Sequence, residues 1–154
     1  MTSRGITRVS EIRTTAMQFK MLRSQMRTTE IARVFDKLTT IKSENRLVPS
    51  DHLRNKKKHG FVSFDKTQLA DVLSSSDNIV EVNSVVATDS FRVLLRGHTD
   101  YNVVLDGKLQ PANLCVVVEL TTGVVVTAYF SKASDNHDNL NQRRYTKFNI
   151  NRFV

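Results

Sequence analysis

Five short runs rich in β-branched and aromatic residues follow one another from Ile79 onward, and they constrain the fold more than any other feature. The runs are 79–86, 91–96, 101–105, 114–120 and 124–130, with turn-forming residues between them. Thr121-Thr122-Gly123 joins the last two at hairpin length. Because no connection is long enough for a helical crossover, neighbouring runs are expected to pair antiparallel. The sequence therefore predicts an antiparallel meander sheet of about four to five strands.

Helical spacing of apolar residues dominates the chain before residue 79. One stripe recurs across 10–26, where Ser10 is placed to cap a helix, and a second stripe, out of phase with the first, crosses 31–41. Short helices are also expected over 50–60 and 66–74. We predict an α+β fold with N-terminal helices, as a single domain over 1–154. It comprises a basic helical part (1–48), a helix plus antiparallel sheet core (49–130) and a polar, irregular C-terminal tail (131–154).

The positive charge of the chain is concentrated at one end. Residues 1–60 contain 14 Lys or Arg and 5 Asp or Glu, a net charge of +9, whereas residues 61–154 contain 9 and 10, a net charge of −1. Clustering of this kind favours a polyanionic partner, such as RNA, contacted by the N-terminal part. The alternative is a solvated basic helix surface that only aids solubility.

Most large enzyme classes are excluded by what the sequence lacks. It has no glycine-rich phosphate loop, no Cys/His zinc spacing, no Gly-x-Ser-x-Gly nucleophile elbow and no concentration of carboxylates for a two-metal nuclease. We therefore expect neither a metal nor a cofactor. Cys115, inside an apolar run, is interpreted as a buried small hydrophobe. No apolar run approaches the roughly 20 residues of a membrane span, and no apolar signal core follows the basic N-terminus, so a cytoplasmic protein is expected.

Residues 49–60 contain the groups that RNA cleavage without metal requires. A base removes the 2′-hydroxyl proton, an acid protonates the leaving 5′-oxygen, and cations stabilise the charged phosphate. Histidine suits the first two roles, because its reference pKa of about 6.5 lies near neutral pH. His52 and His59 are seven positions apart, so on one helix they share a face, with Lys56 alongside. We predict both histidines as catalytic, and Arg54 and Lys56-Lys57-Lys58 as substrate-binding; a solvated basic loop is the alternative.

The strand runs supply further candidates. Arg92 and Arg96 are four residues apart on one predicted strand and so project from the same face, as a phosphate clamp or as partners in ion pairs with Glu81 or Asp106. Thr127 and Tyr129 also share a face, and their hydroxyls can orient a phosphate or a base, or can simply edge the sheet. We assign Arg96 and Tyr129 to catalysis, and Arg92 and Thr127 to substrate binding.

Tyr145 follows Arg143-Arg144 in the C-terminal tail. An aromatic ring with neighbouring cations can stack on a nucleobase, so Tyr145 is predicted to bind substrate. It can equally well anchor the end of the chain on the core. His98, in a predicted turn, and His137, in the tail, are weaker site candidates.

The order of helices, a basic histidine-bearing segment and paired arginines on a strand resembles the small ribonucleases of the RelE and colicin types. The Val125–Tyr129 ending after a Thr-Thr-Gly hairpin is similar to the last strands of bacterial toxin nucleases of that fold. Ser50-Asp51-His52-Leu53, Val80-Glu81-Val82-Asn83 and the total length also resemble the phage RegB endoribonucleases. That resemblance implies a catalytic histidine at His52, messenger RNA as substrate, with the ribosome as one setting for cleavage, no cofactor, and a bacterial or phage-infected cell.

The leading hypothesis is therefore a metal-independent endoribonuclease, in which a toxin-like context would bring an antitoxin as a further partner. Two alternatives stay open. One is a non-catalytic nucleic-acid-binding regulator that uses its N-terminal basic helices, and the other is a phage protein that docks a host protein.

Overall fold

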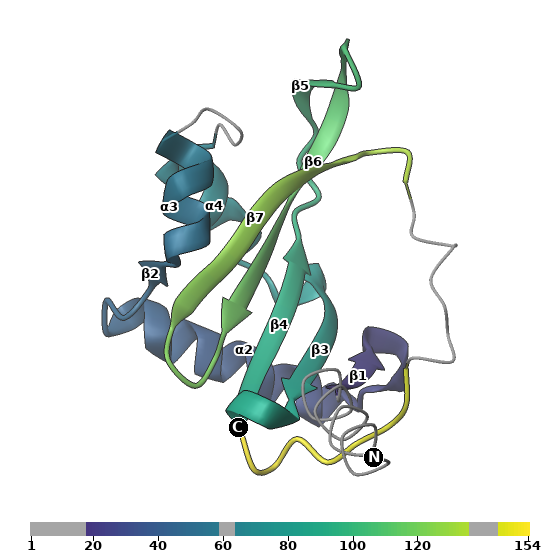
Figure 1. The fold of residues 1–154 in the computed structure, drawn as a ribbon. Helices are drawn as coiled ribbons and strands as arrows, with labels where there is room; N and C mark the ends of the chain where they lie inside the picture. The colour runs from purple at the N-terminus through teal and green to yellow at the C-terminus, as the bar shows by residue number, and fades with distance from the viewer. Residues whose placement is uncertain (1–17, 59–63, 136–144) are drawn as a thin grey trace, which may run out of the picture.

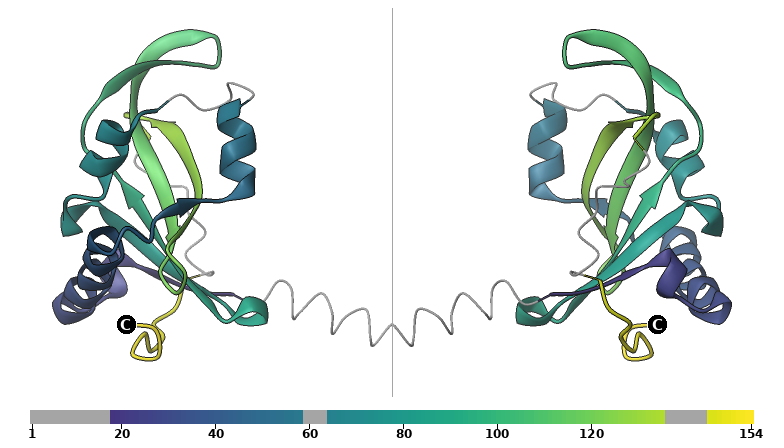
Figure 2. Two further views of the ribbon diagram at one scale, coloured as in Figure 1. Left: turned by 90° about the vertical axis from the view of Figure 1, so that its left-hand side faces the viewer. Right: turned by 90° about the vertical axis from the view of Figure 1, so that its right-hand side faces the viewer.

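The computed structural model describes residues 18–58, 64–135 and 145–154, and the backbone alone for Lys57 and Lys58 (Figure 1). It has an α+β architecture, in which a mixed sheet is flanked by helices α2 (Thr28–Ser43), α3 (Asp51–Lys58) and α4 (Lys66–Val72). Figure 2 shows α2 and α4 on one side of the sheet and α3 beside the opposite side. The expected α+β class is confirmed, and the sheet is larger than expected.

The sheet contains seven strands. Their bounds are β1 (Gln18–Leu22), β2 (Val48–Pro49), β3 (Ile79–Val85), β4 (Ser90–Arg96), β5 (Tyr101–Leu105), β6 (Lys108–Glu119) and β7 (Val124–Lys132). The order is β1-β3-β4-β6-β7-β2, and β5 pairs with β6 outside this path. All pairs are antiparallel except β2 with β7. The five predicted runs are thus strands, and β1 and β2 are additions from outside the meander.

Strands β4 and β5 share one neighbour, which departs from a simple meander. β4 pairs with the second half of β6, from Arg92↔Glu119 to Arg96↔Cys115, and β5 pairs with the first half. Asp106 and Gly107 form the two-residue turn of the β5–β6 hairpin, and both have positive φ (53° and 77°). Positive φ at both positions gives the turn a twist that matches the right-handed twist of the strands. The β5–β6 end projects from the body as an arm (Figure 1).

The core fills the space between the sheet and α2. Val34, Leu38 and Ile41 form the buried stripe of α2, and they meet the apolar residues of β3, β4 and β6 that point to the same side. Glu30 caps the start of α2 by accepting a hydrogen bond from the Arg27 backbone N–H (2.8 Å). Because α2 and α4 cover this side of the sheet, the strands expose their side chains on the opposite side (Figure 2).

The first predicted helix is wrong in its described part. Residues 18–22 form β1, and Arg23–Gln25 form a short 3₁₀ turn, where a helix through residue 26 was expected. Met21 is fully buried in the core, and every residue of β1 pairs with a residue of β3. These long-range contacts outweigh the local helical spacing; residues 10–17 lie outside the described part.

The C-terminal segment 145–154 is packed rather than peripheral. Phe153 stacks on Phe91, with ring centroids 4.8 Å apart, Phe148 contacts the same ring edge-on, and Ile150 is fully buried. Arg33 of α2 donates hydrogen bonds to Asn151 and to the backbone oxygen of Val154. The irregular tail was predicted from residue 131, but β7 extends to Lys132. From residue 145 the chain packs over one end of the core.

Candidate nucleic-acid interface

The sheet side that α2 and α4 leave uncovered, here called the open face, carries rows of side chains that the strand register brings together. On β4, Phe91, Val93 and Leu95 point into the core, so Arg92, Leu94 and Arg96 point to the open face. Register with the neighbouring strands extends this into three rows. The rows are Lys20, Asn83, Arg92 and Glu119; Leu22, Glu81, Leu94, Val117 and Thr127; and Arg96, Cys115 and Tyr129.

Helix α3 is fixed to the edge of this face through Ser50. The Ser50 N–H donates to the Val125 carbonyl (2.9 Å), and its hydroxyl donates to the Val126 carbonyl (2.6 Å). The same hydroxyl accepts from the Leu53 N–H (3.0 Å), so Ser50 is the N-cap of α3. Since β2 runs parallel to β7 just before it, α3 begins beside Val126 and packs along β7.

The orientation of α3 turns His52 and Lys56 toward the open face. Leu53 is buried, and Arg54 lines a cavity between α3 and α4. At 100° per residue, His52 and Lys56 project from the flank of Leu53 opposite to Arg54. Lys56 is half-buried while its neighbours His52 and Asn55 are exposed. This is expected if the aliphatic part of the Lys56 side chain lies against the sheet.

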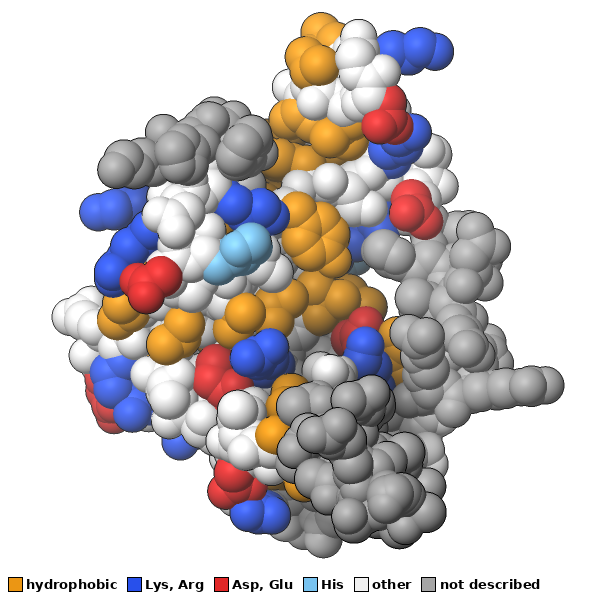
Figure 3. Space-filling view, in the orientation of Figure 1, with side chains coloured by type: hydrophobic (Ala, Val, Ile, Leu, Met, Phe, Trp, Pro, Cys, Tyr) orange, Lys and Arg blue, Asp and Glu red, His pale blue; other side chains and the backbone are white. Residues whose placement is uncertain are grey.

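Figure 3 views the open face and shows apolar side chains of the sheet with Lys and Arg side chains on both flanks.

The structure describes only part of the predicted cluster of histidines and lysines over residues 52–59. Arg54 is separated from His52 and pairs weakly with Asp51 (3.5 Å), both side chains being largely exposed. His59 and the side chains of Lys57 and Lys58 lie outside the described residues.

Arg92 forms an ion pair with a buried carboxylate. Glu119 is only 6% exposed, and its Oε1 accepts from the Phe91 N–H (2.9 Å) and from the Thr121 N–H (3.1 Å) and hydroxyl (2.6 Å). Its Oε2 lies 3.5 Å from Arg92 Nε. The Nη groups of Arg92 have no partner among the described residues, so this guanidinium is positioned and still available to an anion. The ion pair uses Glu119 rather than Glu81 or Asp106.

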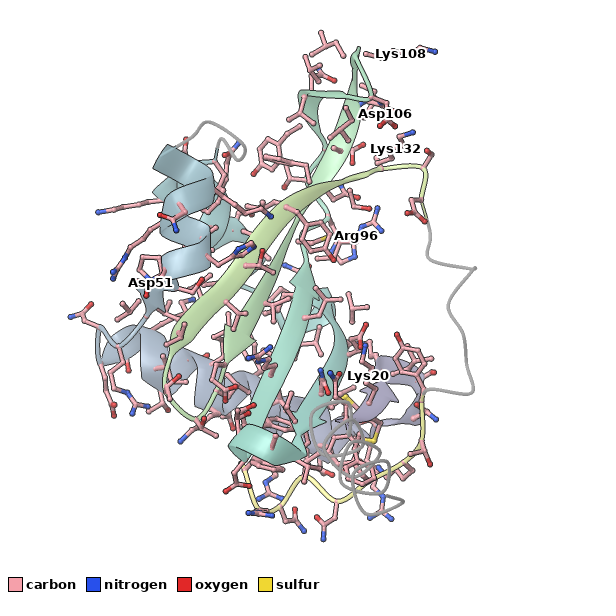
Figure 4. All side chains as sticks on the ribbon, viewed as in Figure 1. Lys20, Asp51, Arg96, Asp106, Lys108 and Lys132 are labelled. Carbon is pink, nitrogen blue, oxygen red and sulfur yellow. The ribbon has the colours of Figure 1, made fainter. Side chains whose placement is uncertain are left out.

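The guanidinium group of Arg96, which was predicted to be catalytic and is labelled in Figure 4, already donates hydrogen bonds to other parts of the protein. Its Nε and Nη2 donate to Asn113 Oδ1 (3.1 and 3.0 Å), Nη2 also donates to the Lys132 carbonyl (2.8 Å), and Nη1 donates to the Asp135 carbonyl (2.6 Å). These bonds fasten the end of β7 to β4 and β6. A phosphate at Arg96 would compete with them, so this arrangement favours a positioning role.

Tyr129 and Cys115 lie side by side in the third row. Burial, followed by the nearby Cys115 and Glu81, raises the pKa of Tyr129 to about 12. Burial likewise raises the pKa of the Cys115 thiol to about 11. Near neutral pH both groups stay protonated, so Tyr129 is suited to donate a hydrogen bond rather than to act as a base. Thr127, half-buried in the second row, is nearer the start of α3.

Tyr145 lies at the far edge of the sheet. It bridges to Lys20 of β1, and its hydroxyl donates to Glu81 Oε1 (3.2 Å). Of the two predicted roles, the contacts favour the terminal anchor. Lys20 is a cation of the open face that the sequence did not place there, because it was expected on a helix. Its ammonium group has no partner among the described residues.

The remaining described histidine does not join this face. His98 lies beside α4, where its Nδ1 is 2.5 Å from Asn78 Oδ1, and Asn78 in turn donates to the Val72 carbonyl (2.9 Å). His137 lies outside the described residues. Within the described ranges there is no group of three or more His, Cys, Asp or Glu side chains arranged to hold a metal ion.

None of the helices in the described part of the chain has the length and apolar character needed to cross a membrane. Comparison of the sequence with known protein families and with curated proteins, and of the structure with solved structures, found no match.

Proposed function

We propose that the protein binds single-stranded RNA on the open face and cleaves it without a metal ion. The observation that carries this proposal is the placement of α3, which packs along β7 and projects His52 and Lys56 from its flank toward the open face. A titratable imidazole, an ammonium group and two hydroxyls, those of Thr127 and Tyr129, then border one surface. These are the groups that acid–base cleavage of a phosphodiester requires.

In the proposed reaction, neutral His52 takes the proton from the 2′-hydroxyl, and the 2′-oxygen attacks the adjacent phosphorus. The bond between phosphorus and the 5′-oxygen breaks, and that oxygen receives a proton from a general acid. The products are a 2′,3′-cyclic phosphate and a free 5′-hydroxyl. Lys56 and Arg92 attract the phosphates, and the hydroxyls of Thr127 and Tyr129 donate to non-bridging oxygens. His59, which was predicted to be catalytic without a specific role and lies outside the described residues, is the candidate for that general acid in this proposal.

The test is incubation of the purified protein with end-labelled single-stranded RNA in excess EDTA. We expect products with 2′,3′-cyclic phosphate ends, and a loss of rate in His52→Ala of about 10²–10⁴-fold with little change in RNA affinity. His98→Gln is the matched control, because it removes a histidine outside the open face and should leave the rate unchanged.

Two results would contradict this function. Salt-sensitive RNA binding without cleavage, alike in wild type and His52→Ala, would indicate a nucleic-acid-binding regulator. Neither cutting nor binding, with or without ribosomes, would indicate a protein that docks another protein.

Messenger RNA as the natural substrate, a ribosomal setting and an antitoxin partner are parts of the same proposal. They are tested by adding ribosomes to the assay and by co-purification from a bacterial host.

A further inference from the structure

A cavity of about 410 Å³ lies between α3, α4 and β2, on the flank of α3 that faces away from His52 and Lys56. Six of its lining residues are apolar: Leu47, Pro49, Leu53, Phe64, Leu69 and Val125. Cavities of this size, with apolar walls and a few polar groups, are typical of small-molecule sites. The open face and the cavity therefore use opposite flanks of the same helix.

The polar residues of the cavity are Arg54, Asp65 and Lys66. Asp65 is engaged in the cap of α4, because its Oδ1 accepts from the Gln68 N–H (2.8 Å) while its own N–H donates to Gln68 Oε1 (3.0 Å). Arg54 has only a weak, exposed pair with Asp51, and Lys66 has no partner among the described residues. The charges free to meet a ligand are therefore positive.

A second hollow of about 380 Å³ continues from the first. The two share Leu47, Lys66 and Leu69, and the second extends toward Lys42 and Leu73. The Lys42 ammonium donates to the Leu73 carbonyl (3.2 Å), so Lys66 is the available cation where the hollows meet. An elongated apolar ligand fits this shape better than a compact, strongly hydrated ion such as phosphate.

We propose that this cavity binds a small amphipathic anion, with an aliphatic or aromatic body against Leu47, Leu53 and Leu69 and a carboxylate at Arg54 and Lys66. Burial of the apolar body supplies the affinity, and the two cations select the charged head. The ligand would contact α3 directly through Leu53 and Arg54. The site is independent of the function proposed for the open face.

Isothermal titration calorimetry of the full chain with decanoate tests this proposal. Decanol, a neutral molecule with the same chain length, is the ligand control. We expect saturable one-to-one binding of decanoate, and binding of decanol that is weaker by about tenfold or more, since hydrogen bonds to charged groups contribute roughly that factor. Equal affinity for the two, or no saturable binding of decanoate, would overturn the proposal.

Three variants and one control variant locate the ligand. Arg54→Gln and Lys66→Gln should each weaken decanoate about 3–10-fold, and Lys108→Gln, at the tip of the arm (Figure 4), should have no effect. Leu69→Trp, which adds volume where the hollows meet, should weaken binding about tenfold or more while circular dichroism shows an intact fold. Unchanged affinity in Arg54→Gln and Lys66→Gln would refute the site, as would tight binding in a folded Leu69→Trp protein.

Discussion

The two sides of the sheet differ in how completely other parts of the chain cover them and pair their side chains. On the helix side, Val34, Leu38 and Ile41 of α2 meet apolar strand residues, and the C-terminal segment closes one end. On the open face, the Lys20 ammonium group and the Nη groups of Arg92 have no partner among the described residues, although Arg92 Nε pairs with Glu119, and Leu94 and Val117 stay half-exposed. A covered side provides stability, and an uncovered polar side is available for binding. The following predictions test this division, from the largest expected effect to the smallest.

Leu38→Ala should destabilise the protein by about 2–5 kcal/mol, because Leu38 is fully buried and truncation leaves a cavity. Leu94→Ala, on the open face of β4, should cost less than about 1.5 kcal/mol, since that side chain is only half-buried. Urea denaturation followed by circular dichroism measures both. Equal losses would contradict the division.

Glu119→Gln should destabilise the protein by about 1–3 kcal/mol. It weakens the bonds from Phe91 and Thr121 and leaves Arg92 beside an amide in place of a carboxylate. The same urea titration measures this loss. A change within about 0.5 kcal/mol of zero would show that the carboxylate is not required to hold the turn.

Arg92→Gln and Arg96→Gln should separate binding from stability. Since the Nη groups of Arg92 are unpartnered within the described residues, Arg92→Gln should weaken the affinity for RNA about 3–10-fold. It should also reduce the slope of log affinity against log salt concentration by about one. Because Arg96 bonds to Asn113, Lys132 and Asp135, Arg96→Gln should instead lower stability by about 1–3 kcal/mol. Fluorescence anisotropy and urea denaturation report the two effects, and the reverse outcome would exchange the roles of the two arginines.

Alkaline pH should reveal the buried hydroxyl. The pKa of Tyr129 is raised to about 12 from a reference value of 10.0, so its contribution to stability is fully present below pH 10 and is lost as the pH rises toward 12. In that range the unfolded chain releases its proton first, which favours unfolding. Tyr129→Phe should therefore lose stability less steeply between pH 10 and 12 than the wild type. Identical slopes in thermal denaturation would contradict a raised pKa.

The local sequence pattern was sufficient to predict a helix or strand where the element has a clear period of its own. The stripe at Val34, Leu38 and Ile41 predicts α2, and the β-branched runs predict the strands from β3 to β7, with small changes at their ends except in β6, which begins at Lys108 rather than at residue 114. The position of His52 on a short helix capped by Ser50 was also predictable, because a cap and the helical spacing are properties of a few adjacent residues.

β1 and β2 could not be predicted in this way. Residues 18–22 fit a helical stripe as well as a strand, and a two-residue strand such as β2 has no period of its own. Both are strands because they pair with β3 and β7, residues far away in the chain. Lys20 consequently moved from an expected helix surface to the open face.

The sequence by itself determined the α+β class, the strand-rich second half and the side of β4 from which Arg92 and Arg96 project, because propensity, period and alternation are local. Only the tertiary structure decided what each arginine does. Glu119 leaves the end of one guanidinium available, whereas Asn113 and two backbone carbonyls occupy the other. Identical residue types on one strand differ in this way because hydrogen-bond partners come from other strands, and no local pattern specifies which strands become neighbours.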